Sequence, residues 1–126
     1  MDVWVRRQRW FSGGPGAAAQ ARHEVHGLAG DALLIGHAVS QRSEGDAALV
    51  ASELVSHAGG ACVLELVLTS GGFDILVSGL PSSVPALTGT GRCVFWWELV
   101  TRLARELTVS STSPLGVTVR VRIDTR

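Results

Sequence analysis

Two ionisable side chains one helical turn apart, Glu53 and His57, form the pair in this sequence best suited to chemistry. Residues four apart on a helix lie on the same face. A carboxylate there can act as a general base, and a carboxylate beside an imidazole can supply half of a metal site. Magnesium prefers oxygen ligands, so His57 would favour a softer ion such as zinc. No cluster of histidine or cysteine completes the ligand set, so we predict no metal site.

The segment that carries this pair, residues 46–58, has the periodicity of an amphipathic helix. Asp46 is a plausible N-cap, the polar residues 40–45 before it are expected to form a loop, and Gly59 and Gly60 end the helix. The apolar residues recur at helical spacing and predict a buried face made of Ala47, Val50, Ala51, Leu54 and Ala58.

The other elements follow from periodicity and from turn residues. A first strand is expected over 3–11 and a first helix over 17–28, ended by Gly27 or Gly30. Residues 32–39 read as a further helix or as its continuation. The remaining prediction is a hairpin of strands around 62–68 and 73–77, a loop over 78–90, a helix over 96–107, a turn over 110–116 and a strand over 117–124.

This order predicts an α+β protein with one domain over residues 1–126. Strands and helices that alternate in this way form a two-layer sandwich, in which helices cover one face of a mixed, mostly antiparallel sheet. At 126 residues the chain is long enough for one core and too short for two.

The run Ser52-Glu53-Leu54-Val55-Ser56-His57-Ala58 resembles the nucleotide-site helix of the GHKL (histidine-kinase-like) ATPase superfamily. It is most similar to the small actinobacterial anti-sigma-factor serine kinases, which often carry Ser-Glu-Leu-Val-Thr-Asn-Ala. The resemblance extends over nearly the whole order of elements. It implies the histidine-kinase-like fold, ATP and magnesium as cofactors, and Glu53 as the catalytic residue of an active member.

Three positions depart from the pattern of that family. His57 stands where the magnesium-binding asparagine is expected, and the chain contains no asparagine at all. Gly79 stands where an aspartate accepts a hydrogen bond from adenine. The phosphate lid is represented by Gly89, Gly91 and Arg92, but Cys93 replaces its second glycine. We therefore expect a degenerate cleft with ATP binding impaired or lost.

Four tryptophans are candidates for partner contacts, because such aromatic residues are enriched at interface hot spots. Trp4 and Trp10 would share one face of the first strand by period two, and this strand is expected at the edge of the sheet. Trp96 and Trp97 are adjacent at the start of a helix, about 100° apart, so one of them should be exposed or cover a cavity or partner.

Composition excludes several classes of protein. Eleven basic residues balance eleven acidic ones, which argues against a nucleic-acid binder. The most apolar run, residues 61–68, is too short to cross a bilayer, and the N-terminus lacks the apolar segment of a signal peptide. Two cysteines do not make a disulfide framework. We expect a cytoplasmic protein with a buried Cys62.

Three functions remain open from the sequence. The first is a regulatory protein resembling an anti-sigma factor, which binds a sigma factor or an anti-anti-sigma-like protein, or forms a homodimer. The second is an active ATP-dependent serine kinase of an anti-anti-sigma partner, with Glu53 as base. The third is a small-molecule-binding or biosynthetic auxiliary protein that uses the emptied nucleotide cleft.

Overall fold

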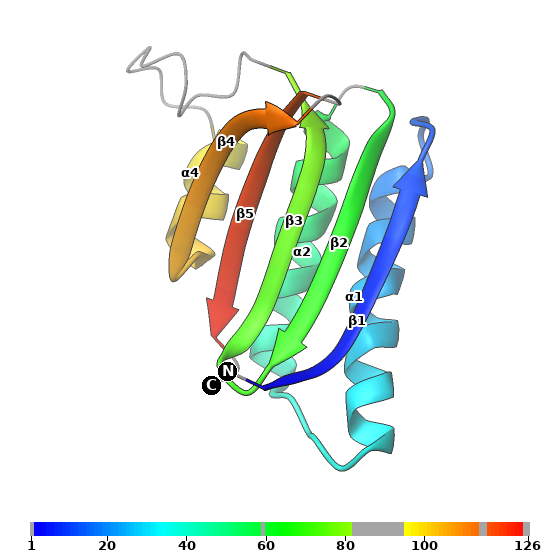
Figure 1. Ribbon diagram of the computed structural model, residues 1–126, viewed down its shortest axis with the longest axis vertical. Coiled ribbons are helices and arrows are strands. Elements are labelled where there is room, and N and C mark those ends of the chain that lie inside the picture. Colours follow the sequence, from blue (N-terminus) through cyan, green and yellow to red (C-terminus); the bar gives the residue numbers. More distant parts are fainter. Residues whose placement is uncertain (1, 59, 82–94, 114–115, 125–126) are drawn as a thin grey trace.

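The computed structural model describes residues 2–58, 60–81, 95–113 and 116–124. Five strands and three helices are found in these residues (Figure 1). In chain order they are β1 (Val3–Phe11), α1 (Ala17–Leu34), α2 (Gln41–His57), β2 (Cys62–Thr69), β3 (Gly72–Leu80), α4 (Phe95–Leu103), β4 (Glu106–Ser113) and β5 (Gly116–Asp124).

The strands form one sheet in the order β1-β2-β3-β5-β4, with β1 and β4 at its edges. All four neighbouring pairs are antiparallel, so the predicted mixed sheet is wrong for the strands described. The three helices lie against one face of the sheet, and Figure 1 looks onto the other face. The α+β class is therefore confirmed, in a two-layer arrangement.

The core fills the space between the helices and the sheet. Alternate residues of β2, β3 and β5 point toward the helices and are buried, as the alternation in the sequence predicted. The predicted apolar face of α2 is also confirmed, since Val50, Ala51 and Leu54 are fully buried. The largest completely buried side chains include Phe73, Leu28, Leu54, Leu64, Leu66, Leu68 and Ile75.

Helix α1 continues to Leu34, past both glycines that were expected to end it. A Cβ atom on Gly27 would lie 2.4 Å from Nη1 of Arg7, so the missing side chain makes room for that guanidinium. Arg7 donates from Nε to Asp31 at 3.0 Å and pairs with Glu24 at 3.4 Å. These contacts between β1 and α1 favour the helix and offset the low helix propensity of glycine.

Helix α2 begins at Gln41, five residues before the predicted start. Its N-cap is Ser40, whose side chain accepts a hydrogen bond of 3.2 Å from the backbone N–H of Ser43. Residues 40–45 are therefore not a loop, and Asp46 is not the N-cap. Serine is among the preferred N-cap residues, so Ser40 was a signal in the sequence that the prediction missed.

The third helix, α4, ends at Leu103 rather than near residue 107. The chain then forms β4, a strand that was not predicted and that includes residues 110–113 of the expected turn. The backbone N–H of Arg105 donates to the carbonyl of Arg122 at 2.8 Å and starts the pairing with β5. Leu103 and Leu107 have helical spacing, whereas Leu107 and Val109 have the spacing of a strand. Residues 106–113 form a strand because they pair with β5.

Among the helices described, none is both long enough and apolar enough to cross a membrane.

Candidate functional site

Helix α2 places Glu53 and His57 on its flank, with the apolar face of the helix turned to the sheet. Nε2 of His57 lies 3.5 Å from Oε2 of Glu53, so the predicted contact over one helical turn is present. Both side chains remain partly accessible, 40% for His57 and 30% for Glu53. No group of three or more potential metal ligands is found among the residues that the structure describes.

The imidazole of His57 is stacked on the indole of Trp96 from α4, with ring centroids 4.0 Å apart and planes 11° from parallel. Trp96 in turn meets Trp97 edge to face at 5.4 Å. One face of His57 is thus covered by an aromatic ring and one nitrogen faces Glu53. This arrangement holds the ring in place through aromatic contacts.

The two adjacent tryptophans are both half-buried and both pack against the core. Neither of them is fully exposed, so the first alternative is wrong, and the alternative that one of them covers a partner surface stays a prediction. The exposed aromatic side chain is Phe95, at 80%, one residue earlier in α4. Neighbouring residues of a helix point in directions about 100° apart, so Phe95 faces solvent while Trp96 stacks on His57 of α2.

Gly79 belongs to strand β3 rather than to the loop that was expected over 78–90. It lies at a bulge where the register with β5 shifts between Ser78 and Leu80, and its φ is +114°. A Cβ atom at this position would lie 2.7 Å from the carbonyl oxygen of Ala61. Both the backbone conformation and the lack of space require glycine here.

Three further residues of the predicted cleft, Gly89, Gly91 and Arg92, lie outside the described residues, as does Cys93.

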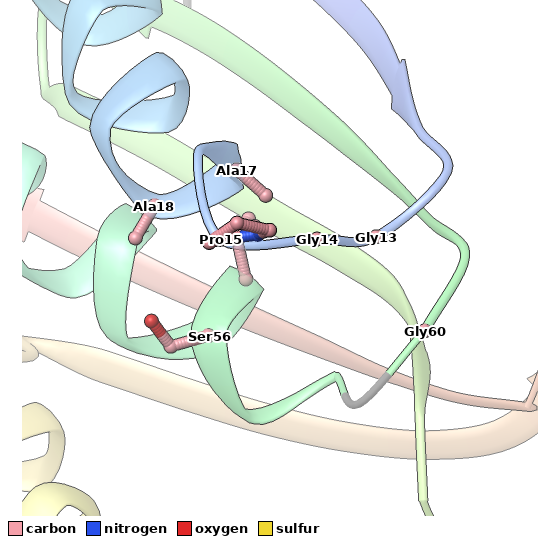
Figure 2. Close-up of a pocket in the computed structure, with 8 residues that line it drawn as sticks. Gly13, Gly14, Pro15, Ala17, Ala18, Ser56 and Gly60 are labelled. Carbon is pink, nitrogen blue, oxygen red and sulfur yellow. The ribbon is translucent and has the colours of Figure 1, made fainter.

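A hollow of about 370 Å³ lies beside the C-terminal end of α2, at Val55 and Ser56. It is formed where the Gly-rich turn before α1 passes Ser56 and Gly60 (Figure 2), and Val55 also lines it. Figure 2 also shows the Ser56 side chain pointing toward Ala18. The residues that line it are Gly13, Gly14, Pro15, Ala17, Ala18, Val55, Ser56 and Gly60, and none has an ionisable side chain. It can hold water or a small neutral group but offers no acid or base.

The tryptophans of β1 lie on opposite faces of the sheet, which corrects the prediction of a shared face. A bulge between Val3 and Val5 shifts the alternation, and Trp4 stacks on His37 at 3.9 Å on the helix side. Trp10 pairs with Val63 on the face without helices and is 56% exposed. Only Trp10 of this pair therefore presents its ring to solvent.

A buried carboxylate on the face of the sheet without helices was not foreseen. Asp74 of β3 accepts hydrogen bonds from Nε and Nη2 of Arg122 at 3.1 and 2.9 Å, and from Nη2 of Arg120 at 3.2 Å. Desolvation by burial works to raise the pKa of Asp74, but the hydrogen bonds from Arg122 and Arg120 outweigh it and hold the pKa below its usual value. The alternation of residues in β3 and β5 could have predicted this cluster, because it puts Asp74, Arg120 and Arg122 on one face of the sheet.

The chain matches no family model, and no curated protein matches it.

Proposed function

We propose that the protein is a regulatory binding module with a histidine-kinase-like scaffold, resembling an anti-sigma factor, in which the position of the nucleotide no longer accepts ATP and magnesium. Gly79 is the observation that carries this proposal. With φ at +114° and the Ala61 carbonyl oxygen 2.7 Å from where a Cβ atom would stand, an adenine-reading aspartate has no place at this position. A hydrogen bond to a charged partner contributes about 1.5 to 3 kcal/mol, so its loss weakens ATP binding by one to two decades.

The environment of His57 supports the same proposal. Replacing an oxygen ligand by an imidazole weakens any magnesium clamp on phosphate groups, and the stacking on Trp96 fixes the imidazole in its present orientation. Glu53 keeps a partly exposed carboxylate, as a kinase would need, but 3.5 Å from His57 that carboxylate has a local partner. The kinase therefore remains the alternative against which the proposal is tested.

The expected partner is a protein of the same regulatory system, a sigma factor or an anti-anti-sigma-like protein, as the resemblance implies. Two features suit such a partner: β1 is an edge strand, and Trp10 and Phe95 present large apolar surfaces to solvent. Edge strands and exposed aromatic rings are common anchors of protein interfaces.

Calorimetry with ATP and magnesium tests the nucleotide part of the proposal. We expect no binding tighter than about 100 μM, for the wild-type protein or for His57→Asn, because one restored ligand leaves the adenine position empty. Wild-type binding tighter than this, with transfer of phosphate to a purified anti-anti-sigma protein that Glu53→Gln abolishes, would establish the kinase instead.

Biolayer interferometry against purified sigma factors and anti-anti-sigma proteins of the host tests the partner. We expect one of them to bind, and Trp10→Ser to weaken that binding about tenfold, as the loss of an aromatic anchor does. Leu34→Ser is the matched control, because Leu34 is 86% exposed on α1 and its replacement removes apolar surface elsewhere on the protein. Absence of binding to every member of both classes contradicts the assignment.

A further inference from the structure

A second hollow, of about 400 Å³, lies at the end of the molecule where α2 begins and β5 ends. The first two turns of α2 line one side of it, and the end of α4 with the residues that follow line the other. At 1.5 Å per residue, Arg42 in this hollow is about 22 Å from His57 along α2. Gly79 is also remote, because the end of β5 at Asp124 pairs with Gly72 at the opposite end of β3. The hollow is therefore separate from the candidate nucleotide site.

The charged side chains around this hollow are mostly positive. Its lining contains three arginines, Arg42, Arg102 and Arg105, and two carboxylates, Asp46 and Asp124. The other lining residues carry no charge, so the hollow has a surplus of one positive charge. An anion is therefore the ligand that its charge favours.

Most of the guanidinium donors in the hollow have no acceptor within the described part of the chain. Nη1 of Arg105 donates to both carboxylate oxygens of Asp124, at 3.0 and 3.1 Å, and this leaves Nε and Nη2 of Arg105 without a hydrogen bond there. Arg42 and Arg102 make no ion pair with any described residue. The same is true of Asp46, although it follows Arg42 by one turn of α2.

We propose that this hollow binds the phosphate group of a small molecule between Arg42, Arg102 and Arg105. Guanidinium groups bind phosphate through paired N–H donors, and a phosphate monoester has three terminal oxygens, one for each arginine. A carboxylate would offer only two oxygens. The volume of about 400 Å³ lies in the range of small-molecule sites, so the rest of the ligand has room beside its phosphate. This inference goes beyond the proposed regulatory function and does not depend on it.

Two features limit the affinity of the site. All three arginines are exposed, so salt screens their attraction for an anion. The carboxylate of Asp46 lines the same hollow and repels a phosphate group. We therefore expect a dissociation constant of about 1 mM for inorganic phosphate in low-salt buffer.

An NMR titration that follows the backbone amides tests the site, with inorganic phosphate and glycerol 3-phosphate as probes and sodium chloride of equal ionic strength as the blank. We expect saturable shifts at Arg42, Asp46 and Arg105, none at His57, and tighter binding of the ester because the hollow has room for its glycerol part. An ester that binds no tighter than inorganic phosphate would assign the hollow to free phosphate. No saturable shift at these residues with either probe, up to about 20 mM, overturns the proposal.

Substitutions of exposed side chains test which residues bind the phosphate. Arg42→Gln and Arg102→Gln should each weaken binding about tenfold, through loss of charge-assisted hydrogen bonds. Arg22→Gln is the matched control, because Arg22 is an exposed arginine of α1 outside the hollow, and it should leave binding unchanged. Circular dichroism checks that each variant is folded.

Asp46→Asn provides the opposite test, because it removes the carboxylate that repels the ligand and keeps nearly the same side-chain size. We expect this variant to bind inorganic phosphate about threefold more tightly than the wild type. Weaker binding by Asp46→Asn, or equal losses from Arg42→Gln and Arg22→Gln, would show that the phosphate does not lie among these residues and would overturn the proposal.

Discussion

The α-carbon of Gly79 lies so close to the backbone of Ala61 that a Cβ atom would stand 2.7 Å from the Ala61 carbonyl oxygen. This contact joins β3 to the segment that leads into β2. In the function proposed above, Gly79 stands where an aspartate would bind adenine. Conversion of Gly79 to aspartate would therefore require the backbone to move. The backbone of this fold requires glycine at position 79.

Substitution of Gly79 by alanine or aspartate is expected to lower the free energy of unfolding by about 2 to 4 kcal/mol, through the positive φ and the clash together. Urea denaturation followed by circular dichroism measures it. Gly45→Ala is the control, because Gly45 lies in α2 with no atom within 4 Å of where its Cβ would stand, and there alanine should stabilise by about 1 kcal/mol. Equal effects of both substitutions would contradict this account of Gly79.

The stacking of His57 on Trp96 is expected to couple α2 to α4. A double-mutant cycle with His57→Ala and Trp96→Ala should give a coupling energy of about 0.5 to 1.5 kcal/mol in urea denaturation, the range of aromatic pairs. Trp4, which stacks on His37 instead, supplies the control. A cycle of His57→Ala with Trp4→Ala should be additive, and coupling of the same size there would show that the first value is not specific to the stack.

The Asp74 carboxylate should make stability depend on acid pH. Its pKa in the folded protein lies below the ordinary value, so the unfolded chain binds the proton more readily. The stabilisation is therefore complete above about pH 4 and is lost as the pH falls through the pKa of the folded state. Urea denaturation between pH 6 and pH 3 should show this loss in the wild type.

Asp74→Asn should lower the free energy of unfolding at pH 6 by about 1.5 to 3 kcal/mol, because Arg122 and Arg120 then hydrogen-bond to a neutral amide instead of a carboxylate. The same variant should lose less stability than the wild type on acidification. If both proteins showed the same pH dependence, the effect would belong to other carboxylates.

The N-cap of α2 can be located by a pair of substitutions. Ser40→Ala should cost about 1 kcal/mol, because the Ser43 N–H loses its side-chain acceptor, and Ser40→Asp should retain most of the stability. Asp46→Ala, at the N-cap position expected from sequence, should change stability by less than about 0.5 kcal/mol. A larger effect at Asp46 than at Ser40 would show that the helix begins where the sequence pattern alone suggested. Thermal denaturation of the three variants makes the comparison.

The sequence by itself determined the elements whose pattern is local. The apolar residues of α2 recur every three or four positions, and Phe73, Ile75 and Val77 alternate in β3, so each segment had one conformation that could bury its apolar side chains. The Glu53–His57 contact followed in the same way, because helical spacing alone brings the two side chains together.

The tertiary structure decided what depends on residues distant along the chain. Residues 106–113 form a strand because they pair with the edge of β5. Helix α1 continues through Gly27 because Arg7 of β1 occupies the space where a side chain would stand. The bulge in β1 turned Trp4 away from Trp10, and the approach of Ala61 fixed Gly79 as glycine. Each of these outcomes is a contact between segments that are separate in sequence, and local periodicity carries no record of such contacts.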